Sequence, residues 1–184
     1  MRSTANDKRM VAFLRGINVG GHHKVPMVQL KQVFSKAGFT HITTVLNSGN
    51  IIFELPENMD GVSDIDLEKI LMAAFEFPIP VVCVSASALA DLIHMNPFKN
   101  EILTKNTRWY VTFLKKKPVK KMAEPWVSAD GSFRIIQIKN TFVFSVLNLE
   151  VTQTSRGMEM LEQFFGKDIT TRNWNTVEKL KPYC

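Results

Sequence analysis

The sequence has few cysteines and no long apolar run, and both absences narrow the class of protein. Only two of its 184 residues are cysteine, Cys83 and Cys184, which excludes a disulfide framework and a cysteine-based metal centre. No apolar run approaches the ~20 residues that are needed to span a bilayer. Residues 1–9 are polar, lack the apolar core of a signal peptide and are predicted to form a disordered lead. We therefore expect a protein of the reducing cytoplasm with no membrane partner.

The hydrophobic fraction is ordinary for a folded protein. It amounts to 45% of the residues, which is enough for a buried core and too much for a disordered chain. The formal net charge of +6 favours anionic partners, because opposite charges attract, but it does not select among them. A small anion and a nucleic acid both remain candidates.

The first half of the chain shows strand and helix patterns in the order of a βαββαβ unit. Residues 10–14 predict a strand, and a glycine-rich loop at 15–21 leads to a helix that begins near Pro26 and ends at Gly38. A hairpin and a second helix with a buried strand after it follow, at residues 42–55, 64–77 and 80–84.

The second half repeats this order. A strand is predicted at 109–113 and a short helix from Pro118 through Trp126. A hairpin at 133–147, a helix ended by Gly166 and a last helix from Trp174 to Leu180 complete the pattern. The predicted division is a lead at 1–9, a first subdomain at 10–88, a connector at 89–106 and a second subdomain at 107–184 with the C-terminal helix. The predicted fold class is α+β, with two ferredoxin-like (βαββαβ-type) subdomains packed together, each with an antiparallel sheet and helices on one face.

Three segments carry a more specific likeness. Residues 14–21 read LRGINVGG, residues 48–50 read SGN and residues 171–176 read TRNWNT. In residue identity, order and spacing they resemble the DUF1697 family of proteins of unknown function, and the resemblance extends over residues 10–181. The resemblance implies two α+β subdomains related to the ferredoxin-like fold. It implies no established reaction, cofactor or ligand.

The glycine-rich loop is the first candidate site. Gly16 and Gly21 have the spacing of a phosphate-binding P-loop, but His22 and His23 stand where lysine and serine or threonine are required. A loop between a strand and a helix can still bind an anion, because backbone N–H groups lie beside the positive end of the helix dipole. The alternative is that the glycines only form a tight connection.

The last motif is the second candidate. Thr171 or Asn173 can cap the final helix and Trp174 can anchor it in the core, but neither role explains Arg172 or Asn175. Arginine offers a planar fork of donors that suits carboxylate or phosphate. We therefore expect Arg172 and Asn175 to join residues of the glycine-rich loop in one polar cleft between the halves.

The leading hypothesis is a binding module for a small anionic ligand, phosphorylated or carboxylated, in this polar cleft. No cofactor and no metal site are expected. The predicted ligand-binding residues are Arg15, Asn18, Gly20, Gly21, Lys24, Ser48, Asn50, Arg172, Asn173 and Asn175. Ser48 and Asn50, like Asn47, are most simply explained as turn residues of the first hairpin.

Two alternatives stay open. The basic strip at 115–121 could bind the phosphates of a nucleic acid, or it could be a solvated face. Its lysines are Lys115, Lys116, Lys117, Lys120 and Lys121. Four aromatic residues lie beside it in the predicted strands, and most of them are expected in the core: Trp109, Phe113, Phe142 and Phe144. The other alternative is an enzyme that uses the cleft, although no nucleophile with a base beside it is evident. The oligomeric state is left open by the sequence.

Overall fold

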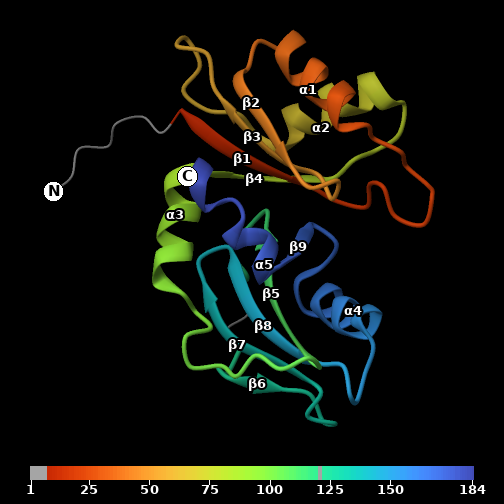
Figure 1. The fold of residues 1–184 in the computed structure, drawn as a ribbon, viewed down its shortest axis with the longest axis vertical. Helices are drawn as coiled ribbons and strands as arrows, with labels where there is room; N and C mark the ends of the chain where they lie inside the picture. The colour runs from red at the N-terminus through yellow and green to blue at the C-terminus, as the bar shows by residue number, and fades with distance from the viewer. Residues whose placement is uncertain (1–7, 120–121) are drawn as a thin grey trace, which may run out of the picture. The chain divides into compact units, whose positions relative to one another are not determined.

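The computed structural model describes residues 8–119 and 122–184. Within them the chain forms helices and strands that assemble into two antiparallel sheets, so the protein has an α+β fold (Figure 1). The elements of the first sheet and its helices are β1 (Arg9–Leu14), α1 (Met27–Lys36), β2 (Thr40–Val45), β3 (Asn50–Glu54), α2 (Asp64–Phe75) and β4 (Val81–Ser85). The elements that follow are α3 (Ala86–Met95), β5 (Thr107–Leu114), β6 (Trp126–Val127), β7 (Phe133–Lys139), β8 (Phe142–Asn148), α4 (Thr154–Phe165), β9 (Ile169–Asn173), α5 (Trp174–Glu178) and a 3-10 turn, η1 (Lys181–Tyr183).

The described chain divides into two compact units. The first unit ends at Asp91 and also includes Leu180–Cys184, and the second runs from Leu92 to Lys179. The division falls inside α3. Each unit contains one of the two sheets and is described by itself below.

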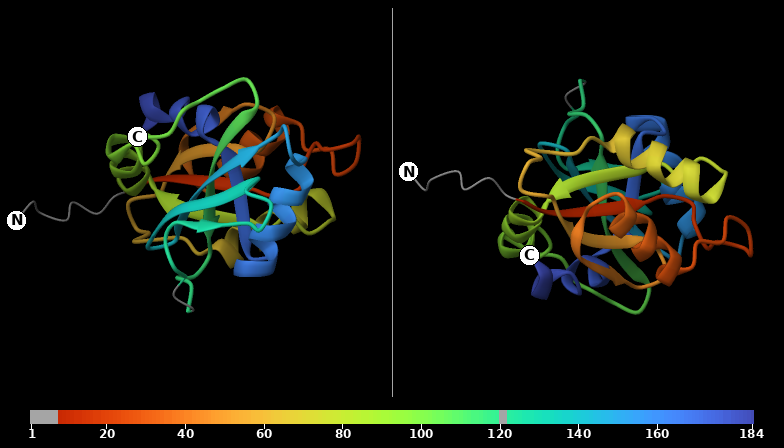
Figure 2. Two further views of the ribbon diagram at one scale, coloured as in Figure 1. Left: turned by 90° about the horizontal axis from the view of Figure 1, so that it is seen from below. Right: turned by 90° about the horizontal axis from the view of Figure 1, so that it is seen from above.

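The first sheet has the strand order β2-β3-β1-β4, with antiparallel neighbours throughout. Figure 2 shows α1 and α2 on the same side of this sheet. Side chains two residues apart on a strand point to the same face, and on this face Ala12 and Leu14 share a core with Phe34 of α1 and Leu67 of α2. The predicted packing of two helices on one face of an antiparallel sheet is confirmed for this unit.

Both helices of the first unit begin where local chemistry favours a helix start. Pro26 stands immediately before α1 in an extended conformation, so its missing N–H is not needed by the helix. At the start of α2, the Ser63 hydroxyl accepts a hydrogen bond from the Asp66 N–H at 3.1 Å and donates to the Asp66 carboxylate at 2.7 Å. Ser63 is therefore the N-cap of α2.

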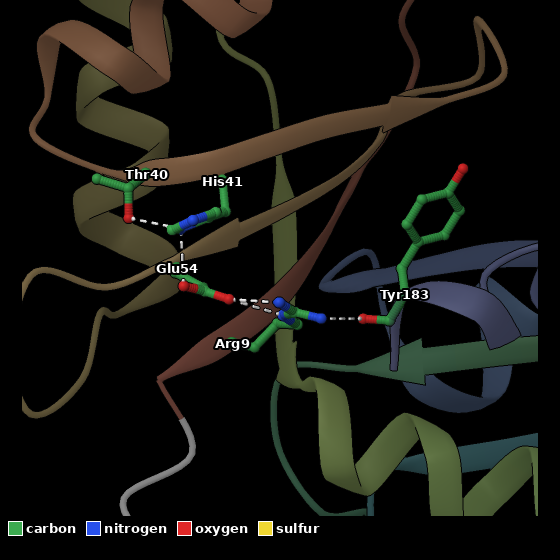
Figure 3. A network of polar contacts seen from close by, with 5 residues as sticks. All are labelled: Arg9, Thr40, His41, Glu54 and Tyr183. Carbon is green, nitrogen blue, oxygen red and sulfur yellow. Dashed lines mark hydrogen bonds and ion pairs between the residues drawn. The ribbon is translucent and has the colours of Figure 1, made fainter.

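A charged network lies where β1 begins and β3 ends in the first unit (Figure 3). The Arg9 Nε and Nη2 atoms donate to Glu54 Oε1 at 2.9 and 2.5 Å, and Glu54 Oε2 lies 2.8 Å from His41 Nδ1. The Arg9 Nη1 atom donates to the Tyr183 carbonyl at 3.5 Å. These contacts connect the C-terminal segment to β1, which agrees with its place in the first unit.

The second sheet has the strand order β6-β7-β8-β5-β9, again antiparallel. One face carries Tyr110, Leu114 and Leu147, which share a core with Leu161 of α4. Three of the four aromatic residues of the predicted set, Phe113, Phe142 and Phe144, are buried, as the sequence predicts. Trp109 is half-buried.

One predicted helix is wrong. The pattern after Pro118 predicts a helix through Met122 and Trp126, but the described residues between 115 and 132 contain none. Trp126 instead pairs with Ile135 in a short strand, β6. Pro125 would lie inside such a helix, where proline lacks the N–H for the helical hydrogen bond and clashes with the preceding turn.

None of the helices in residues 8–119 and 122–184 has the length and apolar character needed to cross a membrane.

Candidate functional site

The glycine-rich loop of the first unit closes on itself as a narrow turn. The His22 N–H donates to the Val19 carbonyl at 3.1 Å, and the Asn18 N–H donates to the His23 carbonyl at 3.1 Å. Gly20 and Gly21 lie between these pairs with φ angles of +60° and +80°. Residues with a Cβ atom rarely adopt this backbone conformation. The two glycines therefore have a structural role in forming the turn.

The Asn18 side chain joins this loop to the turn between β2 and β3. Its Nδ2 atom donates to the Val25 carbonyl at 3.0 Å and to the Asn47 carbonyl at 2.8 Å, and its Oδ1 atom accepts from the Val25 N–H at 2.9 Å. A primary amide has two N–H donors, and both are used here by protein carbonyls. In this conformation Asn18 has no side-chain donor left for an anion.

The Ser48-Gly49-Asn50 motif packs against the motif at residues 14–21. Asn50 is fully buried, and its Nδ2 atom donates to the Val45 carbonyl at 2.8 Å and to Ser48 Oγ at 3.1 Å. The Gly49 carbonyl accepts from the Leu14 N–H at 2.8 Å. The structure thus brings the first two motifs together within the first unit and gives their residues packing and hydrogen-bonding roles.

Arg15 and Lys24 stand at the two ends of the glycine-rich loop. The Arg15 N–H donates to the Pro80 carbonyl at 2.8 Å, and its side chain is half-buried. Lys24 is exposed. These are the cations of the predicted set that belong to the first unit.

In the second unit, Arg172 of β9 is only 8% exposed. Its Nη1 atom donates to Thr170 Oγ1 and to the Thr171 carbonyl, both at 2.9 Å. Burial lowers the pKa of this guanidinium to about 10, because a low-dielectric environment disfavours the charged form. Arg15 belongs to the first unit and Arg172 to the second, so the shared cleft stays a prediction.

Asn173 and Asn175 follow directly on Arg172 at the start of α5. Asn173 caps this short helix, since its Oδ1 atom accepts from the Asn175 N–H at 3.0 Å. Trp174 is buried, as expected for the anchor of this helix. The Asn175 side chain is exposed and therefore accessible to a ligand.

A polar pocket of about 380 Å³ lies beside these two asparagines. Its volume falls within the range of small-molecule sites. The residues that line it all belong to the second unit, and they are Leu103, Thr104, Thr107, Arg108, Trp109, Asn173 and Asn175. Only Asn173 and Asn175 belong to the ligand-binding set that the sequence predicts.

Arg108 is the cation of this polar pocket. Its Nη1 atom donates to the carbonyl oxygens of Lys105 and Thr107, both at 2.8 Å. Two carbonyls on one nitrogen restrain the orientation of the guanidinium. Sequence reasoning missed this residue, although an arginine in a polar segment directly before a buried strand is a signal that could have indicated it.

Trp109 also lines the polar pocket. Its ring stacks on Phe98, with ring centroids 5.2 Å apart and an interplanar angle of 3°. The indole N–H is buried and has no hydrogen-bond partner among residues 8–119 and 122–184. Buried donors are normally paired, and leaving one unpaired costs about 1–3 kcal/mol.

The basic strip is only partly available as a charged surface. Lys115 Nζ lies 3.8 Å from Asp168 Oδ1, and its side chain is mostly buried. Lys116 and Lys117 are exposed. Lys120 and Lys121 lie outside the described residues. Nucleic-acid binding through this strip therefore stays a prediction.

Groups suited to metal binding or nucleophilic chemistry are scarce in the described part of the chain. No cluster of three or more histidine, cysteine or acidic side chains that could hold a metal ion occurs there. Burial raises the pKa of the Cys83 thiol well above its usual range, which keeps it protonated and unreactive at neutral pH.

The fold and the polar pocket together define a mixed α+β protein with a small pocket in its second unit. The chain belongs to the DUF1697 family, a family of proteins of unknown function, whose sequence profile matches residues 8–144. The likeness inferred from the three motifs is thereby confirmed. The fold is similar to that of the conserved bacterial protein SP0830 from Streptococcus pneumoniae, with a TM-score of 0.65 and 22% identity, over 95% of this chain and 97% of that one. No curated protein matches the chain at a significant level.

Proposed function

We propose that the protein binds a small anionic ligand, phosphorylated or carboxylated, in the polar pocket of the second unit. The observation that carries the proposal is the Arg108 guanidinium, which lines this pocket and is restrained by two backbone carbonyls at 2.8 Å. Both carbonyl contacts use the same nitrogen, Nη1. Arginine has five N–H donors, and among the described residues the Nε and Nη2 donors have no partner, so they remain for the ligand.

The neighbouring side chains suit the same ligand chemistry. A guanidinium binds carboxylate or phosphate through two parallel hydrogen bonds, which are stronger than neutral ones. Asn175 supplies an exposed amide, and Thr104 and Thr107 supply hydroxyl groups on the pocket lining.

Binding can be tested with inorganic phosphate and a panel of phosphorylated and carboxylated metabolites. A ligand at one hundred times its dissociation constant should stabilise the folded protein by about 2.7 kcal/mol, which a thermal-shift assay detects. We expect Arg108→Gln to weaken binding of the best ligand by about tenfold to a hundredfold, because a charge-assisted hydrogen bond is worth about 1.5–3 kcal/mol.

Lys105→Gln is the matched control for this experiment. It removes one positive charge three residues away from Arg108, and its side chain does not line the polar pocket. We expect it to leave the affinity nearly unchanged. Equal affinities of Arg108→Gln and the unmodified protein, or no binding across the panel, would contradict the proposal.

The wider set of residues predicted from the sequence can be tested in the same assay. If Arg15 also contacts this anion, as the shared-cleft prediction requires, Arg15→Gln should weaken binding by a similar factor. If only Arg108→Gln has an effect, the ligand is bound by the second unit alone, and the shared-cleft prediction is wrong.

We also infer that both units are ferredoxin-like and related by duplication, in a cytoplasmic protein. The strand orders β2-β3-β1-β4 and β7-β8-β5-β9 are identical when the strands of each unit are numbered in chain order, with β6 as an addition to the second. This order is that of the split βαβ unit. An experimental structure in which the two sheets superpose only with a different strand correspondence would argue against duplication.

A further inference from the structure

A second pocket in the second unit has apolar walls and is separate from the polar pocket. Its volume is about 610 Å³, within the range of small-molecule sites. Its apolar wall consists mainly of Leu114, Met122, Trp126, Phe164 and Phe165. None of these residues lines the polar pocket around Arg108, so the two pockets can be tested independently.

Part of this apolar wall is left in contact with water. Phe164, in the last turn of α4, is 42% exposed, and Val119 at the edge of the pocket is 99% exposed. The Phe164 ring meets Trp126 edge to face, with centroids 4.7 Å apart at 72°. Removing apolar surface from water is favourable by about 25 cal/mol per Å², so an apolar ligand body that covers these side chains would gain affinity.

The charge at the edge of the pocket is positive. Asp168 is the acidic residue that lines it, and its carboxylate lies 3.8 Å from the ammonium group of Lys115. Lys116 and Lys117 also line the pocket and are exposed. With Asp168 balanced by Lys115, these two ammonium groups leave a net charge of about +2 beside an apolar wall.

We propose that this lysine-edged pocket binds an amphipathic anion, a molecule with an apolar body and one carboxylate head group. The apolar body contacts the wall at Trp126 and Phe164, and the head group lies near Lys116 and Lys117. A neutral apolar molecule would not use the lysines, and a nucleic-acid duplex, whose bases are stacked inside the helix, would not cover the apolar wall. The combination of the two features selects the ligand class.

Decanoate is a suitable probe, with 1-decanol as its neutral counterpart. We expect decanoate to bind in isothermal titration calorimetry and to change the tryptophan fluorescence. The change should be lost in Trp126→Phe, which keeps the wall apolar. Decanol should bind more weakly than decanoate, because it lacks the charge that the lysines attract.

Substitutions separate the two contributions to decanoate binding. The double variant Lys116→Gln/Lys117→Gln should weaken it about fivefold to tenfold, since exposed charge pairs are individually modest, and should leave decanol binding unchanged. The matched control Lys99→Gln/Lys105→Gln removes the same charge from exposed positions outside the pocket and should have little effect. Phe164→Ala, at a half-exposed position where folding should be preserved, should weaken both probes about tenfold.

Three outcomes would overturn the inference. The first is that the folded protein does not bind decanoate. The second is that the two double-lysine variants lose decanoate affinity equally. The third is that the protein binds a short oligonucleotide instead of decanoate, with an affinity that depends on the lysines and is unchanged in Phe164→Ala. The last result would favour the nucleic-acid alternative. Because Arg108→Gln should not affect decanoate binding, failure of this inference and failure of the proposed function are distinguishable.

Discussion

Gly49 offers the sharpest test of how the first unit is packed. A Cβ atom at this position would lie 2.7 Å from Ile17 Cδ1 and 2.8 Å from Leu14 Cβ, and the residue has a φ of +77°. The backbone conformation alone costs an alanine about 1–2 kcal/mol. Overpacking of a buried site adds about 1–3 kcal/mol. We therefore expect Gly49→Ala to lower the free energy of unfolding of the first unit by about 2–5 kcal/mol.

Gly21→Ala is the matched control. Its φ is +80°, but a Cβ atom there would meet no atom within 4 Å, so only the backbone contribution remains. All three tryptophans, Trp109, Trp126 and Trp174, lie in the second unit, and their fluorescence reports that unit. Urea unfolding should therefore be followed by far-ultraviolet circular dichroism as well. Equal destabilisation by Gly49→Ala and Gly21→Ala would refute the packing argument, because the two positions have nearly the same φ and differ only in the steric contacts of the added Cβ atom.

Two further predictions concern hydrogen-bonded turns. Asn50→Ala leaves the partly buried Val45 carbonyl without its side-chain donor and should cost about 1–3 kcal/mol in urea unfolding. Asn47→Ala, at an exposed side chain, should cost less than about 0.5 kcal/mol. The Ser128 hydroxyl and the Ser132 N–H and hydroxyl donate to Asp130 and lower its pKa to about 2 from an ordinary value of 3.8. The charged form is thus favoured in the folded state, and its stabilising effect should be present above about pH 4 and lost as the pH falls through 2. A titration followed by nuclear magnetic resonance should show this pKa, and Ser128→Ala should raise it; a pKa of 3.8 in the unmodified protein would count against the assigned bonds.

The sequence predicts the first unit more completely than the second because its elements have clear local signals. Gly38 and Ser63 mark helix boundaries, and the turn between β2 and β3 contains a glycine with positive φ. In the second unit the segment after Pro118 has apolar residues at helical spacing, which favoured a helix. Pairing of Trp126 with Ile135 in β7 gives a strand instead. The spacing of apolar residues is a local signal, and it contains no information about a partner strand elsewhere in the chain.

The polar pocket could be predicted only in part, because tertiary pairing assembles it. Asn173 and Asn175 belong to a motif that the sequence singles out, whereas Arg108 lies far from them in the chain. The antiparallel register of β5 and β9 places Tyr110 opposite Asn173, and this pairing brings the start of β5 beside the start of α5. A register between strands that are distant in sequence follows from the packed sheet and not from the spacing of residues in either segment.

The contrast between Asn18 and Arg108 indicates where a ligand should be sought. Both are polar side chains bonded to backbone carbonyls, but Asn18 uses both of its N–H donors on the protein. Arg108 uses one nitrogen of three and remains on the lining of a pocket. A donor already satisfied by a carbonyl must break that bond before it can bind an anion, and the exchange returns little net free energy. The Nε and Nη2 donors of Arg108 have no partner within residues 8–119 and 122–184 and so have no such bond to break. The affinity of this protein for an anion should therefore depend more on Arg108 than on the motif residues that resemble the family most closely.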